Sequence, residues 1–121
     1  MQVLLPPGWP RPKGYSNGVA ASGRMVFIAG MIGWDAHGVF HTDDFAGQVR
    51  QALQNVMDVL IVRMTWYVTD KREYLAAGRE VGAIFRELVG SYNAAMTAVE
   101  VKALIEDRAK VEIEVTAVVP Q

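Results

Sequence analysis

Cysteine is absent from this chain of 121 residues. Disulfide bonds, zinc sites built from thiolates and cysteine nucleophiles are therefore excluded. No apolar run approaches the roughly 18 residues of a membrane-spanning helix, and the N-terminus lacks the charged and apolar segments of a signal peptide. These absences predict a soluble protein of the cytoplasm that has no membrane partner.

An excess of either charge is also missing. The chain has 12 lysines and arginines against 13 aspartates and glutamates, and the basic residues are scattered rather than gathered into a patch. Such a balance argues against nucleic acid as a partner. Hydrophobic residues make up 51% of the chain, which excludes disorder, and the length predicts one domain over residues 1–121.

Proline is confined almost entirely to one end. Four of the five prolines lie within the first twelve residues, and proline cannot donate a backbone hydrogen bond to a helix or a central strand. Residues 1–13 are therefore predicted to form an extended arm. Trp9 is expected to hold this arm against the body of the protein.

In the first half of the remaining chain, the spacing of apolar residues changes from that of a strand to that of a helix. Residues 19–29 contain two apolar runs around a glycine turn and predict a hairpin. After the capping residues 42–44, apolar side chains recur at helical spacing as far as Leu60. Gln48 falls on the opposite, polar side of this predicted helix.

The second half predicts a strand over 62–69, a helix over 70–90, and two strands over 94–101 and 110–117. This order favours an α+β domain in which both helices pack on one face of the sheet. The other face is then expected to carry mixed charges that meet water or pair in an oligomer: Arg63, Thr65, Tyr67, Glu100, Lys110, Glu112 and Glu114.

The junction between the first helix and the next strand is awkward. A helix that reaches Leu60 leaves no residue for a connection before Ile61, although such loops usually take about 2–6 residues. Either the helix ends one turn early, or a loop is missing from the sequence between these two residues. We favour the missing loop.

Several short motifs, in this order of elements, resemble the RidA/YjgF family, also called endoribonuclease L-PSP. They are Gly14-Tyr15-Ser16-Asn17, Ile28-Ala29-Gly30-Met31, residues 51–56, Val99-Glu100-Val101 and Val111-Glu112-Ile113-Glu114. The resemblance implies a chorismate-mutase-like α+β fold with a mixed sheet and a homotrimer whose three sheets face an inner barrel. It also implies small-molecule clefts between subunits, with Tyr15 and Met96 of different subunits facing one pocket.

The resemblance further implies hydrolysis of reactive enamines and imines to ammonia and keto acids, without a cofactor. Tyr15, Gly30 and Glu112 fall at the family's cleft tyrosine, backbone donor and water-handling glutamate. Three other positions differ from the family pattern. Met96 stands where the family has an anchoring arginine, Gly78 replaces a helix asparagine, and Ala98 replaces a cysteine.

Two functions follow from these differences. In the first, the chain is a divergent deaminase for a larger, more apolar substrate such as 2-aminomuconate, which suits Met96, Ala98 and Trp34, and whose anion meets another residue such as Arg79. In the second, the trimer and cleft remain as a non-catalytic module that binds a small ligand or a partner. A ribonuclease is a remote third option, because no basic stripe is present.

Several of these residues also have structural interpretations. Glu112 alternates with its neighbours as any polar strand residue would, Tyr15 can be a packing residue, and a methionine such as Met96 is most often core filler. His37 and His41 lie around a turn without a third ligand at a diagnostic spacing. We therefore predict no metal site.

Overall fold

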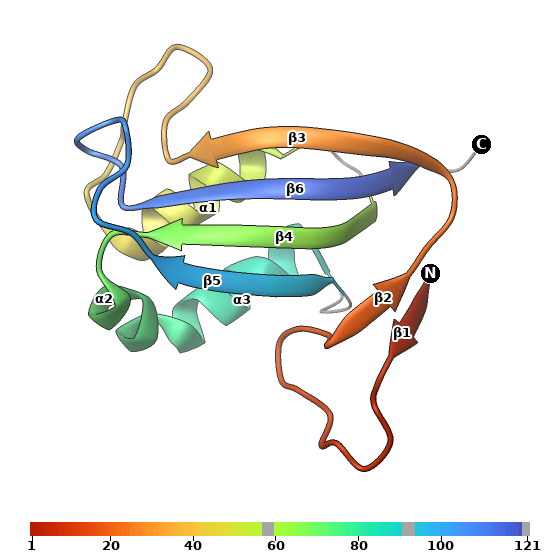
Figure 1. Cartoon of the computed structure of the whole chain (residues 1–121). Coiled ribbons are helices and arrows are strands. Elements are labelled where there is room, and N and C mark those ends of the chain that lie inside the picture. Colours follow the sequence, from red (N-terminus) through yellow and green to blue (C-terminus); the bar gives the residue numbers. More distant parts are fainter. Residues whose placement is uncertain (57–59, 91–93, 120–121) are drawn as a thin grey trace.

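The computed structural model describes residues 1–56, 60–90 and 94–119. A four-stranded sheet forms its centre, in the order β3 (Arg24–Ile32), β6 (Val111–Val119), β4 (Leu60–Val68) and β5 (Ala95–Glu100). The β4–β5 pair is parallel and the other two pairs are antiparallel, so the sheet is mixed (Figure 1). The two edges of this sheet are therefore β3 and β5.

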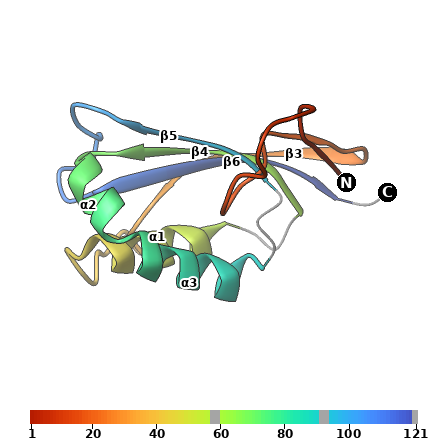
Figure 2. The ribbon, with the colours of Figure 1, turned by 90° about the horizontal axis from the view of Figure 1, so that it is seen from below.

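The helices α1 (Phe45–Asn55), α2 (Lys71–Ala76) and α3 (Gly78–Leu88) all lie on one side of the sheet (Figure 2). Helix α1 packs against β3, β6 and α3. Alternate residues of β4 and β6 face the helices and form the buried core, which includes Met64, Trp66, Val111, Ile113 and Val115. The predicted α+β fold, with helices on one face, is confirmed.

Local signals in the sequence explain where the helices begin and end. The Asp44 carboxylate caps α1 by accepting a hydrogen bond from the Gly47 amide at 2.9 Å. Gly90 has a φ of 93°, and its amide donates to the Phe85 carbonyl at 3.2 Å just after α3 ends. The predicted second helix is divided into α2 and α3 at Ala77, which caps both.

The N-terminal arm differs from the prediction. Strand β2 (Gly18–Ala20) pairs with β1 (Gln2–Leu4) and not with β3, so the predicted hairpin is wrong. The arm folds back and provides β1 as the partner, while β3 pairs with β6. Trp9 is 59% exposed and does not hold the arm. The arm is attached further on, at the buried Ser16, whose amide donates to the Ala94 carbonyl at 3.0 Å.

The connection between α1 and β4 resolves the awkward junction. Helix α1 ends at Asn55 because Val56 takes an extended conformation, with a φ of −76° and a ψ of 131°. Leu60 and Ile61 are consecutive residues of β4. The helix therefore ends a turn early, and the favoured explanation of a missing loop is wrong. Met57, predicted on the apolar face of the helix, lies outside the described residues.

Gln48 is fully buried rather than exposed on a polar helix face. Its amide nitrogen donates to the carbonyls of Thr42 and Arg108, at 3.1 and 3.0 Å, and its oxygen accepts from the Lys110 amide at 2.8 Å. A single side chain thus satisfies three backbone groups of the two loops that pack at this end of α1. The prediction failed because two of these partners, Arg108 and Lys110, lie 60 and 62 residues away in the sequence.

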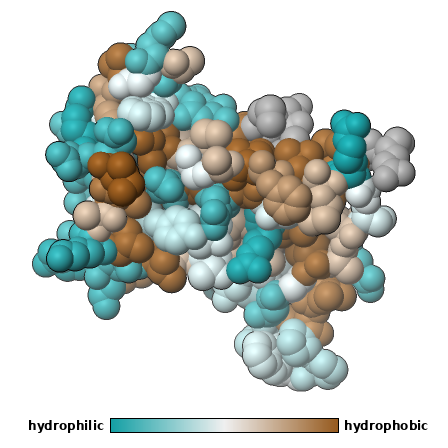
Figure 3. All heavy atoms as spheres, turned by 45° about the horizontal axis from the view of Figure 1, so that its top comes forward, coloured by the Kyte–Doolittle hydropathy of each residue, from teal (hydrophilic) through white to brown (hydrophobic). Residues whose placement is uncertain are grey.

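The face of the sheet opposite the helices is here called the open face. It carries Arg63, Thr65, Tyr67, Glu112 and Glu114, as predicted, together with the exposed Met25 and Phe27 of β3. Hydrophobic and hydrophilic side chains are interspersed on this side of the molecule (Figure 3).

Two residues predicted on the open face lie elsewhere. Glu100 pairs in register with Val68, which faces the helices, and its carboxylate accepts a hydrogen bond from the Lys71 amide of α2. Lys110 precedes β6, and its ammonium pairs with Glu73 of α2 at 3.0 Å. Both side chains therefore belong to the helical side of the sheet.

Candidate functional site

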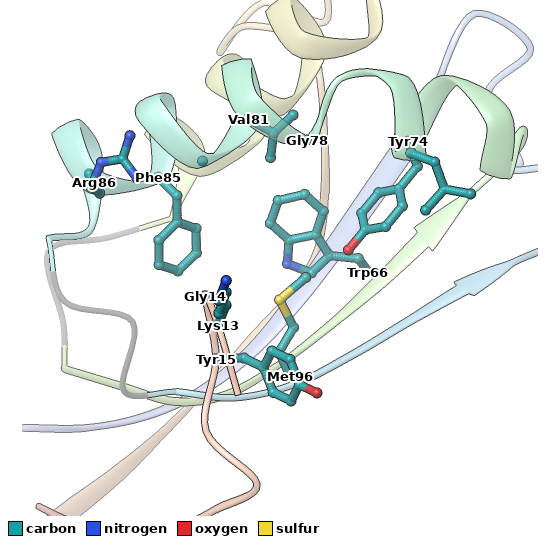
Figure 4. Close-up of a pocket in the computed structure, with 12 residues that line it drawn as sticks. Lys13, Gly14, Tyr15, Trp66, Tyr74, Gly78, Val81, Phe85, Arg86 and Met96 are labelled. Atoms are coloured by element: carbon teal, nitrogen blue, oxygen red, sulfur yellow. The ribbon is translucent and has the colours of Figure 1, made fainter. Parts of the chain in front are cut away.

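A cleft of about 440 Å³ opens between α3, β5 and the end of the N-terminal arm (Figure 4). We call it the β5 cleft. Its walls come from segments far apart in the sequence, which are brought together by the parallel β4–β5 pair and by the helices above it. The lining residues are Lys13, Gly14, Tyr15, Trp66, Tyr74, Leu75, Gly78, Val81, Gly82, Phe85, Arg86 and Met96.

The inner part of the β5 cleft is apolar. Trp66 is 1% exposed, and its indole nitrogen donates to the Met64 sulfur at 3.0 Å, so the indole N–H is already engaged. Met96 and Phe85 complete this surface (Figure 4). A ligand here would meet aromatic rings and a thioether, which favours an apolar or aromatic body.

Polar groups stand nearer the mouth. Tyr15 is 42% exposed, and Lys13 and Arg86 add cationic groups. The phenol of Tyr74, like any tyrosine at neutral pH, can donate a hydrogen bond, and burial raises its pKa further. The β5 cleft therefore combines an apolar interior with donors and positive charge at its entrance.

Backbone geometry fixes the wall formed by the arm. Gly14 has a φ of 81°, a conformation that side chains disfavour, and this turns the chain between Lys13 and Tyr15. Immediately afterwards Ser16 is bound to β5 through the Ala94 carbonyl and a parallel bridge to Ala95. Tyr15 is thus held beside Met96 by the anchored Ser16 that follows it.

A second group of predicted residues lies on the open face, near the β3 edge. A β-bulge between Ile28 and Met31 shifts the register of β3 against β6. Gly30 sits in this bulge directly beneath the Glu112 side chain, and a Cβ atom added at Gly30 would lie 2.7 Å from the Glu112 Cδ. The absence of a side chain at Gly30 therefore makes room for the carboxylate. We call these two residues the Gly30–Glu112 pair.

Glu112 and Glu114 share the open face but differ in their partners. Glu114 accepts a hydrogen bond from the Tyr67 hydroxyl at 2.7 Å, and this bond raises the pKa of the phenol. Within residues 1–56, 60–90 and 94–119, the half-buried Glu112 carboxylate makes no hydrogen bond or ion pair with another residue. Glu112 is thus available to a water molecule or a ligand.

The predicted site residues fall into three sets. Tyr15, Gly78 and Met96 come together in the β5 cleft of one chain, whereas Gly30 and Glu112 form the pair on the open face. Among the described residues, those that lie outside the cleft lining include Trp34, Arg79 and Ala98.

Trp34 belongs to the loop between β3 and α1, where its ring contacts Phe40 at a centroid distance of 5.9 Å. In the same loop, His41 bonds the Asp35 carboxylate at 2.7 Å. The Val39 amide, the His41 ring and the His37 amide lower the pKa of Asp35 to about 2. No cluster of three or more metal-ligating side chains occurs in the described part of the chain.

Sequence reasoning missed Lys13, Trp66 and Phe85 as cleft residues. Trp66 and Phe85 carry the apolar spacing of any core residue, and that spacing gives no sign of a neighbouring cavity. Lys13 lies at the end of a proline-rich segment that showed no local pattern. The predicted contact of Tyr15 and Met96 from different subunits also differs from the structure, in which both residues line the cleft of a single chain.

No helix in the described part of the chain is long and apolar enough to span a membrane. Among proteins of curated function, none matches the chain significantly.

Solved structures do match it. A protein of unknown function of the conserved Rid family, YyfB from Yersinia pestis, has 30% identity and a TM-score of 0.82 over 98% of both chains. Escherichia coli TdcF with bound serine has 26% identity and a TM-score of 0.66 over 98% of this chain and 99% of its own. The YjgF gene product of E. coli has 27% identity and a TM-score of 0.65 over 98% of both chains. The family model of endoribonuclease L-PSP matches residues 10–119, and the chain therefore belongs to this family, the RidA/YjgF family.

Proposed function

We propose that this protein is a hydrolytic deaminase of imines and enamines whose active site combines the β5 cleft of one subunit with the Gly30–Glu112 pair of the next. The observation that carries the proposal is the half-buried Glu112 carboxylate, which is seated over Gly30 and has no partner among the residues that the structure describes. Its neighbour on the same face, Glu114, accepts a hydrogen bond from Tyr67.

The topology of the sheet supports a shared site. Met96 faces the helices and Glu112 faces away from them, so the two lie on opposite faces of one sheet and cannot meet within a chain. The cleft lies beside the β5 edge, and the Gly30–Glu112 pair lies beside the β3 edge. An association around a ring that places the β5 edge of one subunit against the open face of the next, beside β3, would bring the two groups together.

Exposed apolar residues on the open face also favour association. Met25 is 57% exposed and Phe27 is 73% exposed, and both lie on β3. These two side chains lie two residues apart on one strand and therefore share a face of the sheet, and burial of both would favour association. The homotrimer implied by the family resemblance would cover it by turning the three open faces inward.

The chemistry needs water, a base and a bound imine. An enamine first takes a proton on carbon and becomes a protonated imine. Glu112, acting as general base, takes a proton from a water molecule as the water oxygen bonds to the imine carbon, which gives a carbinolamine with a neutral amino group. Glu112 then passes this proton to the amino nitrogen, the carbon–nitrogen bond breaks to release ammonia, and the hydroxyl group loses its proton to water as it becomes the carbonyl group.

The lining of the β5 cleft favours substrates larger than iminopropanoate. The thioether of Met96 has neither charge nor a donor hydrogen, so the cleft interior provides no charge-assisted contact at this position. Trp66, Phe85 and Met96 instead offer apolar surface to a longer carbon skeleton, such as that of an aromatic 2-amino acid imine or 2-aminomuconate.

The same replacements favour a second candidate function. With Met96, Gly78 and Ala98 at three family positions, the chain can retain the cleft as a ligand-binding site that has lost its chemistry. Glu112 would then be dispensable for ligand binding. Measurement of turnover separates the two functions.

Ammonia release from an imine generated in situ by an amino-acid oxidase tests the proposal. The native protein is expected to accelerate the release from an aromatic imino acid. Glu112→Gln is expected to lower this acceleration by about 10²–10⁴-fold, the usual contribution of a general base. Glu106→Gln, at an exposed carboxylate of the loop before β6, is the matched control and is expected to match the native rate.

If the native protein gives no acceleration with aromatic, small or aminomuconate-type imines, the deaminase is excluded and the binding function is favoured. If Glu112→Gln keeps the full rate, the assigned base is wrong.

A further inference from the structure

We infer that Lys13 is the anion-binding residue of the β5 cleft, and that the cleft takes monocarboxylates with an aromatic or branched apolar body. This inference deepens the proposed function, since it names the substrate class of the same site. It rests on the position of Lys13 at the mouth of the cleft, opposite the apolar interior.

The side chain of Lys13 points from the arm toward α3, with its nitrogen beside the space between Phe85 and Trp66 (Figure 4). An aromatic or branched body that packs against Trp66, Phe85 and Met96 would place a terminal carboxylate at the mouth, within reach of this ammonium. Contact between an ammonium and a carboxylate is a charge-assisted hydrogen bond, stronger than a neutral one.

The arm holds Lys13 in this place. Gly14, with its positive φ, follows Lys13 directly, and the bound, buried Ser16 lies three residues after Lys13, so the lysine backbone is held near β5 even though its side chain is exposed. A cation on a fixed backbone can anchor a ligand with less loss of conformational freedom than one on a free terminus.

The chemistry of the other cleft residues agrees with this assignment. Met96 offers no charge, and Arg79, the alternative predicted from the sequence, is exposed outside the cleft lining. Arg86 is the second cation of the cleft and already interacts with another group of the protein. The experiment therefore includes Arg86 as a competing anchor.

Calorimetric titration with two probes separates charge from packing. Phenylpyruvate has an aromatic body and a carboxylate, and phenylacetone has the same body with a methyl group in place of the carboxylate. Lys13→Met is expected to weaken phenylpyruvate binding by about tenfold, the loss of one charge-assisted hydrogen bond, and to leave phenylacetone binding unchanged. Lys13→Arg is expected to stay within about twofold of the native affinity, because the charge is kept.

Lys102→Met, at an exposed lysine outside the cleft lining, is the matched control and is expected to bind both probes like the native protein. The inference is overturned if native protein fails to bind phenylpyruvate, if Lys13→Met binds it normally, or if both probes weaken equally. A selective loss in Arg86→Met without one in Lys13→Met would also overturn it.

Ammonia release by the same proteins distinguishes this inference from the proposed function. If phenylpyruvate binding depends on Lys13 but the protein does not accelerate ammonia release, Lys13 is the anion-binding residue and the deaminase function is excluded. If the protein accelerates ammonia release from an aromatic imino acid and Lys13→Met does not change the rate, the role of Lys13 is excluded and the deaminase function stands.

Discussion

The two edges of the sheet carry different chemistry. The β5 cleft is a half-open, largely apolar space with cations at its mouth, whereas the Gly30–Glu112 pair places a carboxylate on the open face. Among the described residues, the cleft lining offers apolar surface for a carbon skeleton but includes no carboxylate. The pair offers the carboxylate that the proposed reaction needs, but it lies outside the cleft lining. Each edge therefore lacks what the other has, and this favours a site shared between subunits.

The largest effect is expected from disturbing the pair. In Gly30→Ala the new Cβ would overlap the Glu112 carboxyl group, whose flexible side chain can move aside. We expect ammonia release to fall by about 10²-fold, since a displacement of about 1 Å misplaces the base. Stability should change by less than about 1 kcal/mol, because the atoms that must move belong to one flexible side chain. Turnover and thermal unfolding measure the two quantities.

Gly33→Ala provides the contrast for that variant. Its Cβ would lie 2.9 Å from the Cα of Gln48, in a buried part of α1 that cannot move aside. We expect a stability loss of about 1–3 kcal/mol from overpacking. If Gly30→Ala loses stability to the same extent, the glycine serves the fold rather than the carboxylate.

A smaller effect, of opposite sign, is expected in the β5 cleft. Met96→Arg would add a charge-assisted contact worth about 1.5–3 kcal/mol to a substrate carboxylate. We expect kcat/KM for iminopropanoate to rise by about tenfold or more, and that for an aromatic imino acid to fall as apolar surface is lost. Met96→Leu keeps the apolar surface and is the control. An unchanged substrate preference would show that Met96 does not contact the substrate.

The smallest effect is expected from the partnered carboxylate of the open face. Tyr67→Phe removes the hydrogen bond to Glu114 but leaves the Gly30–Glu112 pair intact. We expect a stability loss of less than about 1 kcal/mol and an unchanged rate of ammonia release. A large loss of activity would mean that the two glutamates act together, and the comparison between them would fail.

Most of the fold could be predicted because it depends on local patterns. The alternation of Val111, Ile113 and Val115 defined β6, and Asp44 and Gly90 marked the ends of helices. Gln48 could not be placed, since its partner Arg108 lies 60 residues away in the sequence. A polar residue on the polar side of a predicted helix is expected to be exposed, unless distant backbone groups form hydrogen bonds with its side chain.

The candidate site could be predicted only in part for the same reason. The resemblance supplied Tyr15, Met96 and Glu112, yet nothing local revealed that Met96 and Glu112 lie on opposite faces of the sheet. Lys13 was missed because its place depends on the bond between Ser16 and Ala94, which joins the arm to β5.

Subunit complementation tests the shared site most directly. Gly78→Trp fills the β5 cleft, because the Gly78 side-chain position faces open space in the lining, and Glu112→Gln removes the base. Each variant alone is expected to be inactive. Coexpressed chains that mix randomly should recover about a quarter of the native ammonia release, the share of interfaces at which an intact cleft meets an intact Glu112. A mixed oligomer that stays as inactive as its parents would contradict a site built from two subunits.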